Sequence, residues 1–119
     1  MNHTILLVDD DQAFRNAVSR QLTVAGYKVV ECENGQSAIE TAKKEEFGLM
    51  IVDLNMPGIG GLDLIDSLRR QGKHWPAIIL TSDETVEKVN RALQLGVYEY
   101  FNKNDFDVNA LFDTVRNYI

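Results

Sequence analysis

The chain has 119 residues, a formal net charge of −6 and a pI of about 4.8, with 45% hydrophobic and 25% charged residues. This length favours one domain with a usable core, and the acidic balance excludes the basic face that non-specific nucleic-acid binding requires. No apolar run reaches the roughly 20 residues of a membrane span. The single cysteine, Cys32, excludes an internal disulfide, so we expect a reducing, cytoplasmic setting.

From the N-terminus onward, short apolar runs alternate with windows of helical spacing. The predicted strands, in chain order, are residues 5–8, 27–32, 49–52, 77–80 and 97–101. The predicted helices begin at Gln12, after Asn34, at Gly61, at Asp83 and near Val108. Asp11 is the expected cap of the first helix, and Gly26 its expected stop. In the fourth helix, residues 83–95, the side chains expected to face the core are Val86, Val89, Ala92 and Leu93.

Five strands, each followed by a helix, predict an α/β fold, a doubly wound five-stranded parallel sheet of the flavodoxin-like (βα)5 type. The strands are apolar almost throughout, as a sheet covered on both faces requires. Residues 27–32 carry Lys28 and Glu31, which suits an edge strand. This edge position predicts the strand order 2-1-3-4-5, in which the first and third strands are neighbours and ligands bind beyond their carboxyl ends.

Acidic side chains follow the first and third predicted strands: Asp9 and Asp10 after the first, Asp53 after the third. Carboxylates about 5 Å apart repel each other by roughly 3 kcal/mol at an effective dielectric of about 20. Protonation of one acid, a nearby Lys or Arg, or a hard divalent cation would relieve this repulsion. An all-oxygen cluster without His or Cys is typical of Mg²⁺ or Mn²⁺, so we expect such an ion here.

Two further strand ends supply groups that bind phosphate. Thr81 ends the fourth predicted strand, and Lys103 follows the fifth. A hydroxyl and an ammonium beside a carboxylate cluster can stabilise a phosphoryl group. Taken singly, Thr81 is as well explained as a helix cap and Lys103 as a solvated loop charge. Their convergence on one edge of the sheet favours a shared site.

Four short motifs occur in order along the chain: "LLVDDD", "DLNMPGIGG", "TS" and "YFNK". In this combination, and over essentially the full length 1–119, the chain resembles the receiver domain of two-component response regulators. Each motif alone is common, but the set in this order and at this spacing is specific.

The resemblance implies that Asp53 is the phosphoacceptor, which takes a phosphoryl group from a phosphohistidine and becomes an acyl phosphate. Asp10 and Asp53 would ligate Mg²⁺ (or Mn²⁺) directly, and Asp9 would do so through water. Asn55 occupies the position that lends its backbone carbonyl to the metal.

The resemblance also implies that Thr81 bonds one phosphoryl oxygen and Lys103 another. Thr81 and Tyr100 would form a switch, because movement of Thr81 toward the phosphoryl group makes room for Tyr100 to turn inward. The surface made by the fourth helix, the fifth strand and the fifth helix would then change. Tyr100 is also explained as a plain core aromatic.

The implied partners are a sensor histidine kinase or phosphotransfer protein, which donates the phosphoryl group, and an output domain or downstream protein, which reads the switch. Direct nucleic-acid or membrane binding is not expected of this signalling domain, nor is an enzyme activity on diffusible substrates. A homodimer could form on phosphorylation through charged residues that a solvated face explains equally: Lys88, Arg91, Glu99, Asp113 and Arg116. The sequence does not distinguish a stand-alone regulator from one domain of a longer protein.

The chain departs from the family pattern after Lys103, where the family usually has a proline joined by a cis peptide. Here Asn104 follows, and a cis bond before a non-proline residue costs about 3–4 kcal/mol. We therefore expect a trans Lys103–Asn104 bond and a rearranged loop. Asp83, two residues beyond Thr81, stands where family members tune water access, so its replacement should change dephosphorylation more than phosphorylation.

Three other readings are weaker. A phosphatase with an aspartyl nucleophile typically has a second acid two residues later, where this chain has Asn55. A receiver-like module that is never phosphorylated would not need the intact set Asp9, Asp10, Asp53, Thr81 and Lys103. A flavin-binding protein would place phosphate after the first strand, where "DDDQ" would repel it.

Overall fold

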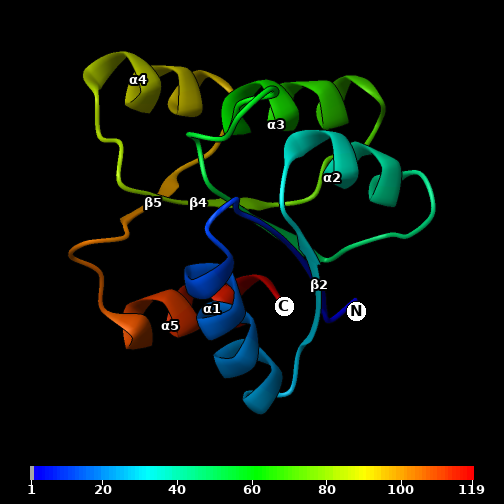
Figure 1. The fold of residues 1–119 in the computed structure, drawn as a ribbon, viewed down its shortest axis with the longest axis vertical. Helices are drawn as coiled ribbons and strands as arrows, with labels where there is room; N and C mark the ends of the chain where they lie inside the picture. The colour runs from blue at the N-terminus through cyan, green and yellow to red at the C-terminus, as the bar shows by residue number, and fades with distance from the viewer. Residues whose placement is uncertain (1) are drawn as a thin grey trace.

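A parallel five-stranded sheet forms the centre of the protein, in a computed structural model that describes residues 2–119 (Figure 1). The strands are β1 (Thr4–Val8), β2 (Lys28–Cys32), β3 (Leu49–Val52), β4 (Ala77–Thr81) and β5 (Glu99–Asn102). The helices are α1 (Gln12–Val24), α2 (Gly35–Ala42), α3 (Gly61–Arg70), α4 (Val86–Gln94) and α5 (Val108–Tyr118). The strand order is β2-β1-β3-β4-β5, so the predicted fold class and order are confirmed.

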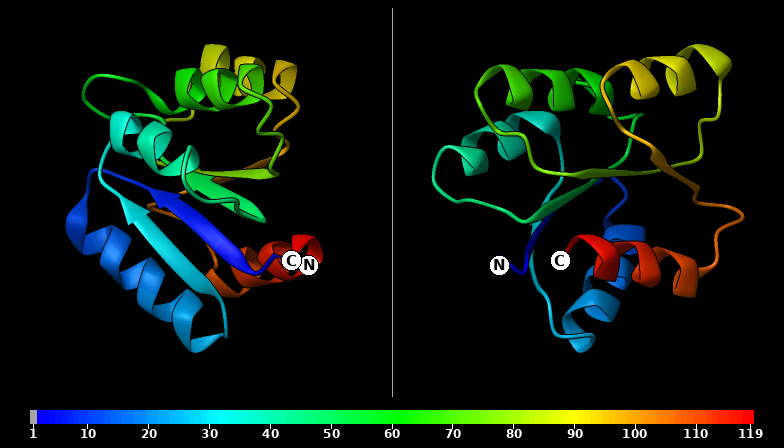
Figure 2. Two further views of the ribbon diagram at one scale, coloured as in Figure 1. Left: turned by 90° about the vertical axis from the view of Figure 1, so that its right-hand side faces the viewer. Right: turned by 180° about the vertical axis from the view of Figure 1, so that it is seen from behind.

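Helices cover both faces of the sheet, with α2, α3 and α4 on one side and α1 and α5 on the other (Figure 1 and Figure 2). Successive side chains of a strand point to opposite faces. Met50 and Val52 of β3 therefore join the core beneath α2 and α3, whereas Leu49 and Ile51 join the core against α1 and α5. Every residue of β3 and β4 is buried, which explains why these two runs are apolar on both faces.

β2 is an edge strand, as predicted, and pairs with β1 along its inner side. Its Lys28 and Glu31 are exposed, and charged side chains at an edge disfavour pairing with another chain.

The residues predicted to cap α1 and α2 make the hydrogen bonds expected of helix caps, and the glycine predicted to end α1 has the expected backbone conformation. The Asp11 carboxylate accepts a hydrogen bond from the Phe14 N–H at 3.0 Å, and the Asn34 side chain accepts one from the Ser37 N–H at 2.8 Å. Gly26, just beyond α1, has φ = 103°, a left-handed conformation that glycine adopts without strain.

α4 differs from the prediction in its start and in the face that it buries. It begins at Val86 rather than Asp83, because the Asp83 carboxylate accepts the Thr85 N–H at 3.0 Å and keeps the preceding segment in a turn. Val86 and Leu93, expected in the core, are 73% and 48% exposed, and Ala92 is the buried residue of the helix. The side chains of Val86 and Leu93 lie roughly 100–120° around the helix from Ala92. The apolar stripe of α4 is therefore wider than the face that packs against the rest of the domain.

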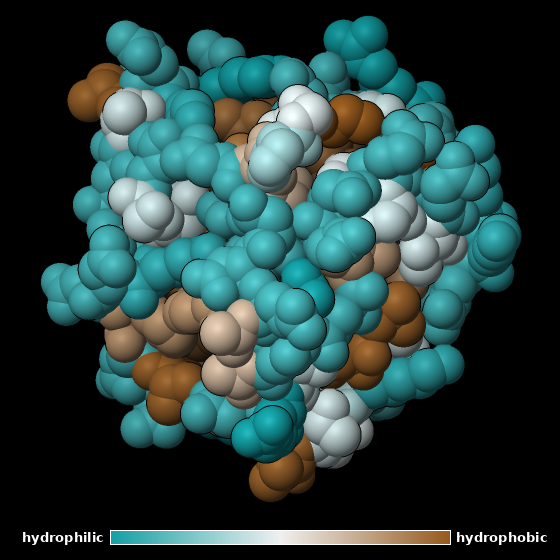
Figure 3. Space-filling view, in the orientation of Figure 1, coloured by the Kyte–Doolittle hydropathy of each residue, from teal (hydrophilic) through white to brown (hydrophobic). Residues whose placement is uncertain are grey.

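No helix within residues 2–119 combines the length and the apolarity that a bilayer crossing requires. The face of the molecule in Figure 3 is largely polar, with its apolar residues in separate places. Among residues 2–119, the large hydrophobic residues that are exposed are Val24, Val86, Leu93 and Tyr98.

Candidate functional site

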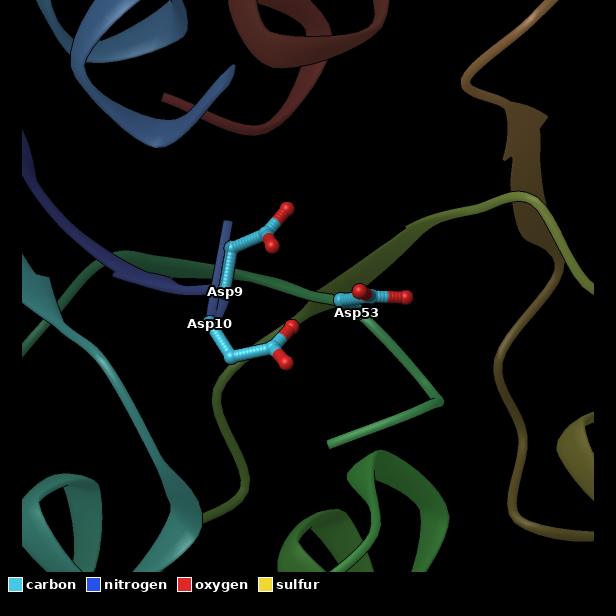
Figure 4. Close-up of side chains that lie close together, drawn as sticks. All are labelled: Asp9, Asp10 and Asp53. Atoms are coloured by element: carbon cyan, nitrogen blue, oxygen red, sulfur yellow. The ribbon is translucent and has the colours of Figure 1, made fainter. Parts of the chain in front are cut away.

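Three carboxylates meet where β1 and β3 end. Val8 and Val52 are paired in the register of these strands, and the Asp53 N–H donates to the Val8 carbonyl at 3.0 Å. The residues that follow the two strands therefore leave the sheet side by side. Oxygens from Asp9, Asp10 and Asp53 all lie within 4.8 Å of one another (Figure 4). The structure thus brings together the three acids that the sequence indicated, and we call them the acidic cluster.

The three acids of the acidic cluster differ in burial. Asp9 and Asp53 are only 2% and 6% exposed, whereas Asp10 lies on the open side. Burial raises the pKa of the Asp9 carboxyl, because desolvation penalises its charged form more than bonds from Lys103 and the Asp11 N–H favour it. A further cation placed beside this buried carboxyl group would stabilise its ionised form.

Lys103 reaches the acidic cluster from the loop after β5. Its Nζ lies 2.7 Å from Asp9 Oδ2 and 3.1 Å from Asp53 Oδ2. Burial alone would lower the pKa of Lys103, but its hydrogen bonds to the two carboxylates outweigh burial and raise it. Lys103 is therefore a charged group held inside the site rather than a solvated loop residue.

The donor set of the acidic cluster fits a hard divalent cation. It offers carboxylate oxygens, the ligands that Mg²⁺ and Mn²⁺ prefer. One ammonium among three carboxylates leaves a formal excess of two negative charges when all groups are ionised, which matches the charge of such an ion. Asp9, Asp10 and Asp53 could hold this ion.

Thr81 is fully buried at the end of β4, the strand next to β3. Its carbonyl accepts a hydrogen bond from the Lys103 N–H at 2.9 Å, and its Oγ1 accepts one from the Asp83 N–H at 3.3 Å. The second bond uses a lone pair of the hydroxyl and leaves its hydrogen available. Thr81 can therefore donate to an acceptor such as a phosphoryl oxygen.

Asn55 lies in the loop after β3, and its N–H donates to Asp53 Oδ1 at 3.4 Å. Its side-chain amide turns toward α4: the amide nitrogen donates to Asp83 Oδ2 at 3.0 Å, and the amide oxygen accepts from the Lys88 ammonium. The Lys88 Nζ also lies 2.7 Å from Asp83 Oδ2. We call these three side chains the Lys88 bridge. The sequence analysis did not place Lys88 at the site, since no spacing rule links a residue of α4 to two loops.

Asp83 connects the Lys88 bridge to the predicted switch residues. Lys88, together with the Thr85 N–H and the Asn55 amide, holds the pKa of the Asp83 carboxyl well below its usual range. The Asp83 carbonyl accepts a hydrogen bond from the Tyr100 hydroxyl. Burial, with the negative charge of Asp83, raises the pKa of Tyr100 to about 12. Tyr100 therefore contacts the loop that follows Thr81.

Lys103 packs on the ring of Phe14 from α1, and this ring in turn contacts Phe106 from the loop before α5. The Lys103 Nζ lies 4.7 Å from the centroid of the Phe14 ring, and Phe106 packs edge-on against that ring at 6.1 Å. A cation–π contact stabilises by about 0.5–1 kcal/mol at exposed sites and by about 2 kcal/mol where the cation is desolvated, and the Lys103 side chain is only 13% exposed. The spacing of apolar residues along the first helix does not indicate the contact between Phe14 and Lys103.

The Lys103–Asn104 peptide is trans, as predicted, since residues 2–119 contain no cis peptide bond. Asn102 closes the turn that follows. Its side-chain oxygen accepts the Asn104 N–H at 2.8 Å, and its carbonyl accepts the Asp105 N–H at 3.2 Å.

Glycines after Asp53 allow the chain to turn tightly behind it. A Cβ on Gly61 would lie 2.2 Å from the Asp53 carbonyl oxygen, so no larger residue fits without a shift of the backbone. Gly58 has φ = 78°, which favours glycine.

Comparison with known proteins identifies this architecture. A family model described as the response regulator receiver domain matches residues 5–116. The chain belongs to this family. The receiver domain is 33% identical to the response regulator protein FleR of Pseudomonas aeruginosa over 114 residues, which is 96% of this chain and 24% of FleR. It is 27% identical to the sporulation initiation phosphotransferase F of Bacillus subtilis, over 100% of this chain and 95% of that protein.

Solved structures show the same fold. The receiver domain matches the chemotaxis protein CheY4 of Vibrio cholerae with a TM-score of 0.89 and 29% identity, over 100% of both chains. It matches the response regulator TrrA of Thermotoga maritima, solved in complex with Mg²⁺-BeF, with a TM-score of 0.86 and 28% identity, again over 100% of both chains.

Some of the relatives are much longer than this chain. The chain spans 24% of FleR and 24% of the transcriptional regulatory protein DctD of Pseudomonas aeruginosa.

Proposed function

We propose that Asp53 of this receiver domain accepts a phosphoryl group from a phosphohistidine on a sensor histidine kinase or phosphotransfer protein. One observation carries the proposal: the Asp53 carboxylate is bonded to Lys103 at 3.1 Å and shares a 4.8 Å cluster with Asp9 and Asp10. A carboxylate nucleophile with a cation beside it, and acids that can hold a second cation, is what transfer of an anionic group requires.

In the proposed transfer, a carboxylate oxygen of Asp53 attacks the phosphorus atom. The P–O bond forms as the P–N bond breaks, and the histidine nitrogen keeps the electron pair of the broken bond. Lys103 then pairs with one phosphoryl oxygen, and the Thr81 hydroxyl donates its hydrogen to another. Hydrolysis of the acyl phosphate by water returns the Asp53 carboxylate and releases inorganic phosphate.

The residues proposed to hold Mg²⁺ (or Mn²⁺) are Asp10 and Asp53 directly, Asp9 through water, and Asn55 through its backbone carbonyl. When bound, this ion supplies positive charge that neutralises the phosphoryl oxygens. The all-oxygen donor set of the acidic cluster supports this assignment, as does the presence of Mg²⁺-BeF in the structure of TrrA.

Phosphorylation is proposed to act through Thr81 and Tyr100 on the surface formed by α4, β5 and α5. Asp83 supports this coupling, because its N–H bonds Thr81 and its carbonyl bonds Tyr100. An output domain or a downstream protein would read that surface, or a second copy of the chain would bind it. Residues 1–119 would then be one receiver domain that signals and does not turn over a diffusible substrate.

Incubation with acetyl phosphate and Mg²⁺ tests this proposal by intact-mass and radiolabel measurements. We expect one acid-stable, base-labile phosphate per chain in the wild type and in the exposed control Asp63→Asn, and none in Asp53→Asn. Undiminished labelling of Asp53→Asn would refute the assignment. Continuous turnover of phosphomonoesters would indicate an aspartyl phosphatase instead.

A further inference from the structure

The Lys88 bridge joins three separate segments of the receiver domain. Asn55 comes from the loop after β3, Asp83 from the loop after β4, and Lys88 from α4. The Lys88 Nζ is 2.7 Å from Asp83 Oδ2 and donates to Asn55 Oδ1, and the Asn55 amide nitrogen donates to Asp83 Oδ2 at 3.0 Å. Each side chain therefore contacts both of the others, and the ring of contacts is closed.

Both loop residues of the Lys88 bridge are also bonded to a residue of the proposed phosphoryl site. The Asn55 N–H donates to Asp53 Oδ1 at 3.4 Å, and the Asp83 N–H donates to Thr81 Oγ1 at 3.3 Å. A change in either loop is thus passed directly to the acceptor carboxylate or to the hydroxyl expected to bind the phosphoryl group. Lys88 touches neither Asp53 nor Thr81 in these contacts and acts on them through Asn55 and Asp83.

Apolar packing alone holds α4 weakly, because Ala92 is its one buried residue. A hollow of about 380 Å³ lies beside the helix and is lined by Lys88 and Arg91 among others. The second ion pair of α4, Arg91 with Asp63, joins side chains that are 44% and 65% exposed, whereas the Asp83 carboxylate is only 14% exposed. Exposed ion pairs contribute little, so the contact with Asp83 is the better placed of the two to position α4.

We propose that Lys88 is a positioning residue that holds Asn55 and Asp83 together beside Asp53 and thereby slows the hydrolysis of the acyl phosphate. This inference rests on the proposed function. Without Lys88, a single amide–carboxylate hydrogen bond joins the two loops, and the Asp83 carboxylate has lost its cation. The loops then separate more readily, and water reaches the phosphorus atom more often.

Three variants isolate this contact. Lys88→Met removes the ammonium and keeps the length of the side chain, and Lys88→Arg restores a cation. Arg91→Met makes the matched charge change one turn along α4 and breaks only the pair with Asp63. After phosphorylation by acetyl phosphate and removal of the donor, we expect Lys88→Met to lose phosphate about two- to fivefold faster than the wild type, the size set by a partly exposed ion pair. Lys88→Arg and Arg91→Met should decay at the wild-type rate.

Three further measurements separate positioning from a general loss of structure. In the Asp83→Asn background, Lys88→Met should accelerate the decay less than it does in the wild type, because one of the two partners through which Lys88 acts has been changed. In the unphosphorylated protein, the NMR resonances of the Asn55 side-chain amide should shift in Lys88→Met and not in Arg91→Met. Urea unfolding midpoints should agree among the single variants.

The outcomes distinguish the inference from the function on which it rests. Phosphorylation of the wild type with identical decay in Lys88→Met overturns the inference and leaves the proposed function standing. Equal acceleration in Lys88→Met and Arg91→Met also overturns it, because the effect would then follow the charge of α4. A wild type that takes up no phosphate refutes the proposed function, and the inference with it.

Discussion

The two sides of the site are held in different ways. At the ends of β1 and β3, the positions of Asp9 and Asp53 follow from strand register, and the Asp53 N–H is part of the main-chain ladder at 3.0 Å from the Val8 carbonyl. On the α4 side, the positions of Asn55 and Asp83 rest on contacts between side chains, with Lys88 at the centre. The acidic cluster therefore stands on a rigid frame, whereas Asn55 and Asp83 beside it are held by side-chain contacts that can adjust.

Burial explains this contrast between β3 and α4. All four residues of β3 are buried, and α4 buries Ala92 alone. Segments with few buried apolar contacts open with the lowest free energies. A firmly packed strand can hold the nucleophile in place, and a weakly packed helix beside it can move. A site that must change a neighbouring surface without displacing its nucleophile needs both.

The largest expected difference between the two regions is in stability. Ile51→Ala in β3, where the side chain is 1% exposed, should lower the free energy of unfolding by about 2–5 kcal/mol. Leu93→Ala in α4, where the side chain is 48% exposed, should lower it by about 0.5 kcal/mol or less. Urea denaturation measures both, and similar losses would show that α4 is packed as firmly as the sheet.

The next largest effect concerns the cation inside the site. Lys103→Met should slow phosphorylation by acetyl phosphate by about 100- to 1000-fold, because a preorganised donor to the phosphoryl oxygens is lost. Lys44→Met removes an exposed lysine beyond α2 and is the control, with an unchanged rate expected. The rate of radiolabel uptake in the presence of Mg²⁺ measures both. A Lys103→Met rate close to that of the wild type would remove Lys103 from the proposed mechanism.

A smaller effect is expected on the adjustable side. Asp83→Ala should change the dephosphorylation rate by about two- to tenfold, the range that a hydrogen bond of ordinary strength gives, and should change the phosphorylation rate less. The reason is that Asp83 contacts Thr81 and Asn55, which flank Asp53, and is not itself a member of the acidic cluster. Pulse labelling followed by a chase gives the two rates. Equal changes in both would contradict this division of roles.

The smallest effect concerns the alkaline titration of Tyr100, whose pKa is raised from 10.0 to about 12, first by burial and then by the charge of Asp83. Since the folded state favours the neutral phenol, this contribution to stability is fully present below pH 10.0 and is lost as the pH rises through about 12. The difference in tyrosinate absorbance between the wild type and Tyr100→Phe should have its midpoint near 12. A midpoint at the value of a free tyrosine would show that Tyr100 is more open than its contact with Asp83 implies.

Sequence reasoning placed β3 correctly and failed at α4, and it began the fifth strand at residue 97 where the structure begins β5 at Glu99. The run Leu49–Val52 is apolar throughout and became β3 with the predicted bounds, because a central strand is buried on both faces whatever packs against it. The fourth helix has a wide apolar stripe, and from spacing alone Val86 and Leu93 looked as core-facing as Ala92. The structure leaves both of them exposed, because the side on which a helix docks depends on its neighbours. The start of this helix was also misplaced, since Asp83 caps a turn rather than beginning a helix.

By itself, the sequence determined that five strands form, that they stack in the order 2-1-3-4-5, and that Asp9, Asp10 and Asp53 leave the sheet at one edge. The strands follow from the side-chain period, which is a local property of the chain. The shared edge follows because parallel strands all end at the same side of a sheet. Only the tertiary structure decided that Lys103 pairs with both Asp9 and Asp53, and that Lys88 reaches Asp83. Contacts of this kind depend on where separate loops and a helix come to rest against the sheet, and the packing of the whole domain sets those distances.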